Sequence, residues 1–173
     1  CGISHTTVRE WLTVLEASYI VYLLHPYYRN FGKRLVKTPK LYFLDSGLMA
    51  YLLGIRDPVS LATHATRGAL FETLIVSERI KREFNAGRPA ELYFWRDSGG
   101  HEVDLLIPQG DRFTPVEIKS GVTFSSDWVS TLRKLSGRFG DAALQPMIVY
   151  GGERGYVREG CQVAGWRTLD TLP

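Results

Sequence analysis

The 173 residues are 45% apolar and 23% charged, which is too apolar for a disordered chain. No apolar run approaches the roughly 18 residues that a membrane-spanning helix needs. The two cysteines, Cys1 and Cys161, define neither a disulfide framework nor a zinc site. We therefore expect a globular protein of a reducing compartment, the cytoplasm, without membrane association. Because the chain opens on Cys1-Gly2-Ile3-Ser4 rather than on methionine, we also expect a fragment of a longer protein.

The net charge is +3, and its excess of basic residues lies in the first 64 positions. Between Glu16 and Asp45 the chain carries no acid, whereas five basic residues occur there: Arg29, Lys33, Arg34, Lys37 and Lys40. Such a run suits a phosphate backbone, although a solvated basic loop has the same composition.

The first part predicts a helix followed by two strands. Residues 4–17 carry apolar side chains at helical spacing and a capping-box pattern, Thr7-x-x-Glu10. Residues 19–24 predict a strand ended by His25-Pro26, and residues 40–44 predict the return strand. Helix, strand, basic turn and strand are the order of the last helix and wing of a winged helix-turn-helix. That order predicts DNA contacts from Arg9 on the helix face and from the basic run.

Residues 45–53 predict a short helix capped by Ser46, and residues 56–64 predict a connector. We therefore divide the chain into a partial winged helix-turn-helix, residues 1–64, and a second domain, residues 65–173. The second domain predicts a helix over 66–84, strands over 91–96, 102–107 and 114–119, a helix over 128–139 and a strand over 146–150. A loop over 151–160 and an edge strand over 163–169 follow. The fold class is α/β (α+β) with the order αβββαβ.

Acidic and basic side chains alternate with apolar ones in two of these strands. Alternation predicts that Glu102 and Asp104 point to one face, opposite Val103, Leu105 and Ile107. In the next strand, Glu117 and Lys119 point away from Val116 and Ile118. Paired carboxylates bind a hard cation such as Mg²⁺, which activates water, and a neighbouring lysine stabilises charge on a phosphate. An exposed Glu-x-Lys ion pair without function remains the alternative.

Asp104 followed by Glu117-Ile118-Lys119 resembles the core of the PD-(D/E)xK nuclease superfamily, although Val103 replaces its proline. The resemblance implies that Asp104 and Glu117 bind Mg²⁺ or Mn²⁺ and that Lys119 positions the attacking water. It also implies that Glu72, on the preceding helix, is an outer metal ligand or holds a metal-bound water. A solvated helical acid is the alternative for Glu72. Arg96 and Glu102 are polar neighbours suited to contacting phosphate or supporting the site.

More narrowly, five segments resemble the C-terminal region of prokaryotic ATPases classed as a domain of unknown function, DUF4143. They are KLYFLDSGL at 40–48, RGALFE at 67–72, YFWR at 93–96, EVD at 102–104 and VEIKSG at 116–121. In that family an AAA-type ATPase domain precedes this region. The present chain has no G-x-x-x-x-G-K-[ST] motif, so we expect no nucleotide site in it.

Three functions remain open from the sequence. The first is a metal-dependent nuclease module that binds DNA and hydrolyses its phosphodiester bonds. The second is a catalytically inactive module that docks DNA or protein for the ATPase. The third is a structural module that mediates self-association.

Overall fold

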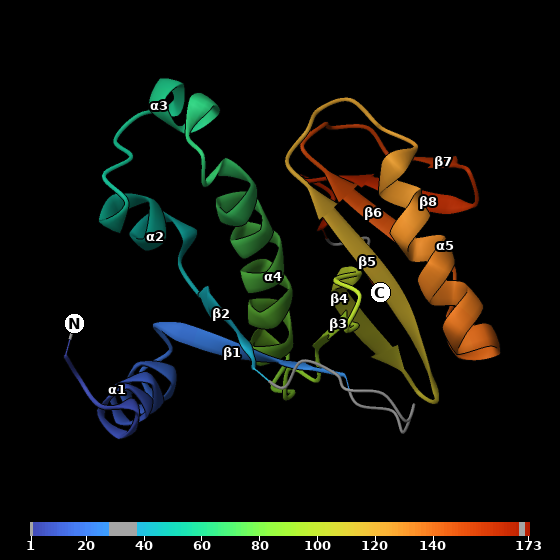
Figure 1. Cartoon of the computed structure of the whole chain (residues 1–173). Coiled ribbons are helices and arrows are strands. Elements are labelled where there is room, and N and C mark those ends of the chain that lie inside the picture. Colours follow the sequence, from blue (N-terminus) through green and yellow to red (C-terminus); the bar gives the residue numbers. More distant parts are fainter. Residues whose placement is uncertain (1, 28–37, 170–171) are drawn as a thin grey trace.

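The computed structural model describes residues 2–27, 38–169 and 172–173 (Figure 1). In the described part of the chain, the strands form one mixed eight-stranded sheet in the order β2-β1-β3-β4-β5-β6-β8-β7. The fold class is therefore mixed α/β. The helices are α1 (His5–Ala17), α2 (Ser46–Leu52), α3 (Pro58–Thr63), α4 (Arg67–Asn85) and α5 (Asp127–Phe139). The strands are β1 (Val21–Pro26), β2 (Lys40–Phe43), β3 (Tyr93–Arg96), β4 (Glu102–Gln109), β5 (Arg112–Lys119), β6 (Met147–Tyr150), β7 (Tyr156–Arg158) and β8 (Cys161–Gly165).

The two longest core helices lie on opposite faces of this sheet, as Figure 1 shows. Ile75, Val76 and Ile80 of α4 pack in one apolar cluster with residues of β4 and β5. Val129, Leu132 and Leu135 of α5 pack in a second cluster on the other face. Both helices fall where the sequence predicts them, because their apolar side chains recur at helical spacing and need a sheet face to cover them.

The predicted strands at residues 19–24 and 40–44 correspond to β1 and β2, which pair antiparallel. β1 continues two residues beyond the predicted end, through His25-Pro26, and pairs in parallel with β3 there. Pro26 has no N–H to donate, and the backbone N–H of the next residue, Tyr27, donates to Phe94 O at 2.7 Å. Through this pairing, strands from both sides of the predicted domain boundary at residue 64 belong to one sheet. The division into two domains stays a prediction.

The segment between β2 and α4 holds two short helices rather than one. The predicted helix at residues 45–53 is α2, but Asp45, not Ser46, is its N-cap, accepting the backbone N–H groups of Gly47 and Leu48. The predicted connector contains α3, in which Asp57 caps the first turn and Pro58 takes the first helical position. In both helices an aspartate carboxylate accepts hydrogen bonds from backbone N–H groups of the first turn, which have no partner within the helix.

The C-terminal part differs from the prediction in two strands. β7 lies inside the segment predicted as a loop, and it forms the edge of the sheet. β8 pairs with β6 on one side and β7 on the other, so it is an inner strand and not the edge strand that we predict. Cys161, Val163 and Ala164 of β8 are buried accordingly.

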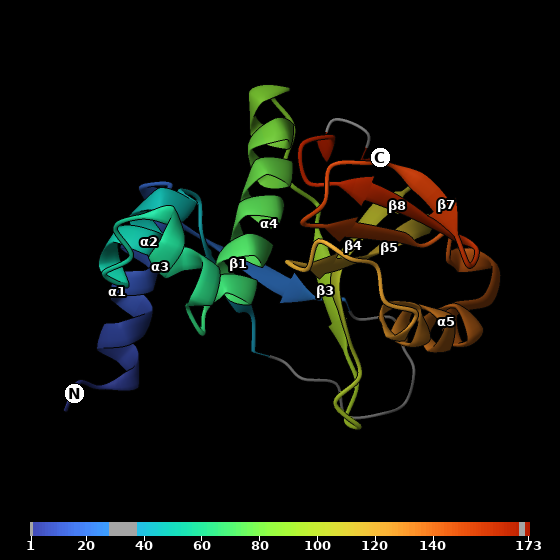
Figure 2. The same cartoon turned by 90° about the horizontal axis from the view of Figure 1, so that it is seen from above.

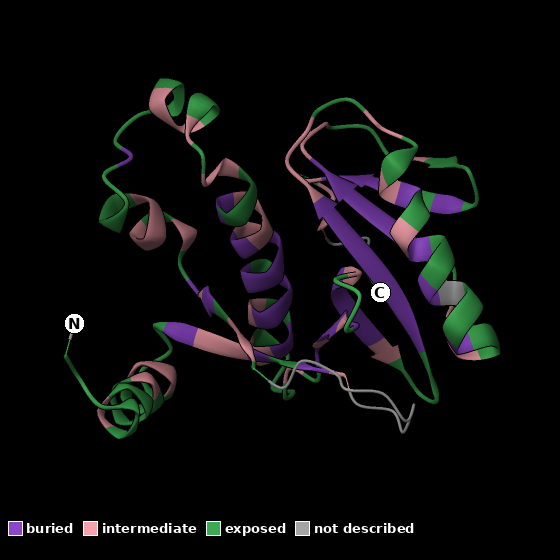
Figure 3. Cartoon of the chain, viewed as in Figure 1, coloured by how far each residue is buried: buried purple, intermediate pink, exposed green. Residues whose placement is uncertain are grey.

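Helices α1 to α3 lie beyond α4, away from α5, in both Figure 1 and the view from above in Figure 2. Figure 3 shows α1 without a buried residue, although its sequence has a clear apolar face. Trp11 is 57% exposed and Val14 is 63% exposed. In the described part of the chain, no helix has the length and apolar character needed to cross a membrane.

Candidate metal site

The candidate site forms where β4 and β5 separate. The register of the two strands runs from Gln109 opposite Arg112 to Leu105 opposite Val116. From Val116 to Lys119, β5 pairs in parallel with β6 on its other side. Beyond Leu105, the Oδ2 of Asp104 accepts a hydrogen bond of 2.8 Å from the backbone N–H of Ile118. The carboxylate thus takes the place of a backbone carbonyl of β4 as the acceptor.

An irregular register in β4 corrects one of the predictions from alternation. Leu105 and Ile107 pack in the cluster under α4, whereas Val103 packs in the cluster under α5. Strict alternation would have put all three on one face. The register between β3 and β4 shifts between Tyr93 and Trp95, as at a β-bulge, and a bulge puts neighbouring side chains on the same face.

Three acidic side chains from two elements converge beside this irregularity. Glu72 of α4 and Glu102 and Asp104 of β4 each offer a carboxylate oxygen, and these oxygens lie within 4.8 Å of one another. We call Glu72, Glu102 and Asp104 the acidic triad. Asp104 is buried, and the other two are half-buried.

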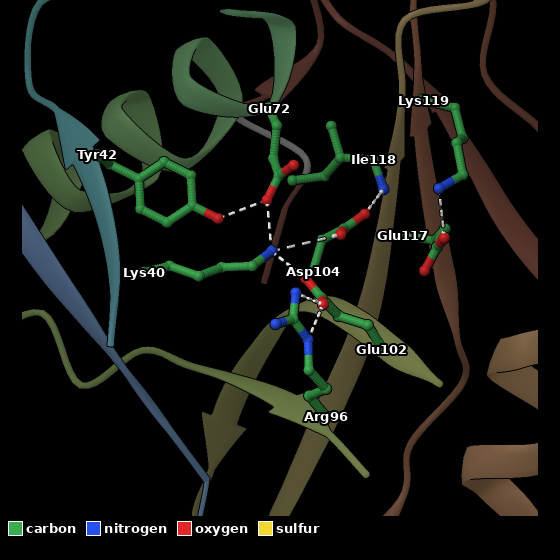
Figure 4. A network of polar contacts seen from close by, with 9 residues as sticks. All are labelled: Lys40, Tyr42, Glu72, Arg96, Glu102, Asp104, Glu117, Ile118 and Lys119. Atoms are coloured by element: carbon green, nitrogen blue, oxygen red, sulfur yellow. Dashed lines mark hydrogen bonds and ion pairs between the residues drawn. The ribbon is translucent and has the colours of Figure 1, made fainter. Parts of the chain in front are cut away.

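The ammonium of Lys40, from β2, contacts every member of the acidic triad (Figure 4). Its Nζ lies 2.7 Å from Glu72 Oε1 and 3.8 Å from Asp104 Oδ1, and it forms an ion pair with Glu102. The Lys40 side chain is only 20% exposed.

Tyr42 and Arg96 complete the surroundings of the triad. The Tyr42 hydroxyl donates a 2.5 Å hydrogen bond to Glu72 Oε1, the same oxygen that Lys40 contacts. The Arg96 guanidinium forms an ion pair with Glu102, which lies opposite it across β3 and β4. These contacts fix the directions of Glu72 and Glu102.

Glu117 and Lys119 form a separate pair on β5. Lys119 Nζ lies 2.5 Å from Glu117 Oε1. Glu117 is buried, and its Oε2 has no hydrogen-bond partner among the described residues. A buried carboxylate oxygen without a partner is costly, because its lost hydration is not replaced. The four acids predicted from the sequence thus divide into the triad and the Glu117–Lys119 pair.

The surroundings raise the pKa of both buried acids. Burial, reinforced by the negative charges of Glu117 and Glu72, raises the pKa of Asp104 to about 7. Burial also raises the pKa of Glu117, although the ammonium of Lys119 opposes this effect. Because burial and neighbouring negative charges disfavour the ionised carboxylates, a cation bound among them would stabilise their charged form.

Both lysines remain cationic in this environment. Burial lowers the pKa of Lys40, but the charges of Glu72 and Asp104, together with hydrogen bonds to Glu102 and Glu72, raise the pKa overall. The same balance holds for Lys119, where Glu117 and Asp104 outweigh burial. The site therefore contains two ammonium groups, each held by a different set of carboxylates.

The residues present fit a divalent cation. Three carboxylates supply the oxygen ligands that Mg²⁺ and Mn²⁺ prefer. The unpartnered Oε2 of Glu117 is an additional acceptor at the neighbouring strand. Asp104 and Glu72, two of the predicted metal ligands, lie in the triad. The ligand roles of Asp104, Glu72 and Glu117 all stay predictions.

The predicted nucleic-acid contacts have different surroundings. Arg9 is exposed on α1. Lys40 and Arg96 instead pair with acids of the site. The predictions for Arg29, Lys33, Arg34 and Lys37 lie outside the described residues. A role in DNA binding stays a prediction for all of them.

The sequence does not predict that Lys40 and Tyr42 contact the acids of this site. It predicts Lys40 only as part of the basic run that contacts DNA, and it gives Tyr42 no chemical role. Residues two apart in a strand point to the same face, so the sequence does indicate that Lys40 and Tyr42 lie together. The sequence did not indicate that this face meets Glu72, because β2 reaches α4 only through the tertiary fold.

Together, the fold and the cluster define a mixed α/β domain with an acidic site able to hold a metal ion. Residues 67–169 match the model of a domain of unknown function, DUF4143, and the chain belongs to that family. Residues 1–59 match a second domain of unknown function, DUF8612. Segment 40–48 lies within this second match and outside the DUF4143 match.

Two curated relatives are uncharacterized proteins of Mycobacterium bovis (strain ATCC BAA-935 / AF2122/97) and Mycobacterium tuberculosis (strain ATCC 25618 / H37Rv). Each is 32% identical to this chain over 152 residues, which are 87% of the chain and 32% of the relative. The chain thus spans about a third of the length of these relatives. No solved structure matches the chain significantly.

Proposed function

We propose that this chain is a metal-dependent nuclease module that hydrolyses phosphodiester bonds of DNA. The observation that carries the proposal is the acidic triad beside the Glu117–Lys119 pair, at the point where β4 and β5 separate. In the same proposal, the region around the site is a PD-(D/E)xK nuclease-like fold, and the N-terminal hairpin is the wing of a winged helix. The whole protein would be a cytoplasmic AAA-type ATPase.

Each residue has a defined task in this proposal. Asp104 and Glu72 hold the cation, and Glu117 adds the oxygen that lacks a partner. A bound divalent cation neutralises phosphate charge and makes water acidic enough to attack at neutral pH. Lys119 orients that water. The water would lose a proton to solvent as its oxygen forms a bond to phosphorus. The bond from phosphorus to the leaving oxygen would break, and that oxygen would take up a proton, giving a phosphate monoester and an alcohol.

The direct test is a cleavage assay on linear, branched and single-stranded DNA with Mg²⁺ or Mn²⁺. We expect Asp104→Asn and Lys119→Met to abolish cleavage while DNA affinity at matched salt stays unchanged. Asp111→Asn, in the exposed turn between β4 and β5, is the matched control and should cleave normally. Full activity of purified Asp104→Asn would show that the assignment is wrong.

A second candidate is an inactive docking module for the ATPase. The apolar face of α1 supports it, because Trp11 and Val14 are exposed in the described part of the chain. Exposed apolar patches often mark contacts with other proteins. This candidate predicts no cleavage by any variant, and a Trp11→Glu substitution that changes mass in solution or binding to the ATPase without unfolding the chain.

A further inference from the structure

Lys40 places a positive charge where the acidic triad would hold a metal. The three carboxylates that lie within 4.8 Å of one another are the same three that the ammonium contacts. Figure 4 shows the Lys40 nitrogen between Glu72 and Asp104, with Glu102 also within reach. The ammonium thus offsets part of the negative charge of the three acids.

An ammonium and a divalent cation are not compatible at this position. A metal ion lies about 2.0–2.6 Å from its oxygen ligands, so it would occupy the space between the three carboxylates that the Lys40 ammonium contacts. Two cations held by the same oxygens would also repel each other strongly in a half-buried site. Loading the triad with a metal therefore requires the ammonium to leave.

The Lys40 side chain can move without unfolding β2. Its backbone pairs with Leu24 in the hairpin, and Tyr42, two residues on, remains hydrogen-bonded to Glu72. The side chain is a flexible stem that is already 20% exposed. After displacement, the ammonium would remain tethered at the edge of the site.

We propose that Lys40 is a built-in competitor for the metal site, so that a divalent cation binds the acidic triad only by displacing its ammonium. This inference rests on the proposed function, since it describes regulation of the same site. It makes the position of β2 a determinant of metal affinity.

Lys119 is not expected to act in the same way. Its ammonium pairs with Glu117, and it has no ion pair with the triad. Lys81 is a further comparison, because it pairs with Glu78 on an exposed face of α4. Lys81→Met removes the same charge as Lys40→Met, so it controls for a general electrostatic effect.

The first measurement is calorimetric titration with MnCl₂ at pH 7.5 of the wild type and of Lys40→Met, Lys81→Met and Asp104→Asn. We expect Lys40→Met to bind Mn²⁺ at least about tenfold more tightly than the wild type, whereas Lys81→Met matches it. Asp104→Asn should lose binding, which identifies the triad as the site.

The second measurement uses the wild type alone, so it does not depend on the folding of a variant. Lysine acetylation is followed by mass spectrometry with and without saturating Mn²⁺. We expect the ion to speed acetylation of Lys40 severalfold and to leave Lys81 unchanged.

The outcomes separate the two proposals. Equal Mn²⁺ affinity of wild type and Lys40→Met, with unchanged acetylation of Lys40, overturns the competitor role and leaves the metal site standing. An absence of Mn²⁺ binding in the wild type and in Lys40→Met at millimolar concentration overturns both the competitor role and the metal-dependent function.

Discussion

Asp104 accepts the backbone N–H of Ile118 through the same carboxylate that belongs to the acidic triad. One side chain therefore closes the gap between β4 and β5 and also contributes to the site. The buried position that suits the structural role of Asp104 favours a neutral carboxyl group, whereas metal binding requires a charged one. The carboxylate binds metal when ionised, but its burial disfavours the charge.

The first prediction concerns Asp104 and pH in the absence of metal. Its pKa is about 7 in the folded protein, against an ordinary value of 3.8. Because the folded state binds this proton more tightly than the unfolded state, stability is lost as pH rises from about 4 to about 7. Asp104→Asn keeps an oxygen for the Ile118 amide and removes this loss.

Thermal unfolding in a chelator should therefore give similar midpoints for wild type and Asp104→Asn at pH 4. At pH 8 the variant should melt higher, by about 2–4 °C for each kcal/mol relieved. Asp111→Asn should follow the wild type at both values. A variant that melts below the wild type at pH 8 would contradict the assigned pKa.

Tyr42→Phe tests the hydrogen bond to Glu72. The phenyl ring preserves the packing of Tyr42, but Glu72 Oε1 then keeps only Lys40 as a partner. We expect a loss of about 1 kcal/mol in the free energy of unfolding, measured in urea. The wild-type and variant proteins should have the same circular dichroism. No change in stability would mean that water replaces the hydroxyl at no cost.

Glu83 should support the fold against acid. Hydrogen bonds from Arg88 and Arg79 lower its pKa to about 2, from an ordinary value of 4.5. Its contribution is complete above pH 4.5 and is lost as pH falls toward 2. Glu83→Gln should cost about 1–3 kcal/mol in urea unfolding at pH 7. The difference from wild type should shrink at pH 3, and a difference that grows there would refute this account.

A pair of glycine substitutions tests a close backbone contact beside the site. A Cβ on Gly151 would lie 2.5 Å from the backbone oxygen of Ser120, directly after Lys119. Gly151→Ala should therefore destabilise the fold and displace the end of β5, lowering Mn²⁺ affinity. Gly137 on α5 has open space around it, so Gly137→Ala should stabilise by about 0.5–1 kcal/mol. Equal melting of the two variants would argue against the contact.

Most of the secondary structure follows from local patterns. The apolar spacing of α4 and α5 and the glycine-containing turn between β4 and β5 place these elements within a few residues of their positions. β7 is missed because Val157 is 69% exposed and its flanks contain glycines, so the segment has the composition of a loop. β8 is assigned to the edge because β7 is missed.

The site is predictable only in part, for a physical reason. Asp104 and Glu117 lie in strands whose alternation defines a face, whereas Glu72 is indicated only by the resemblance to the nuclease superfamily. Lys40 enters the triad through the pairing of β1 with β3, which brings β2 to α4. The spacing of residues within β1 or β3 does not indicate which distant strand each will pair with, so the position of Lys40 could not be predicted.

The parallel pairing of β1 with β3 has a practical consequence for anyone who shortens this protein. A fragment starting at residue 65 would expose β3 as a bare edge whose amides and carbonyls invite other chains. It would also lack Lys40, so Glu72 and Asp104 would lose their ammonium partner while Glu102 keeps Arg96. Such a fragment should aggregate, and any cation affinity measured on it would describe an artefact of truncation.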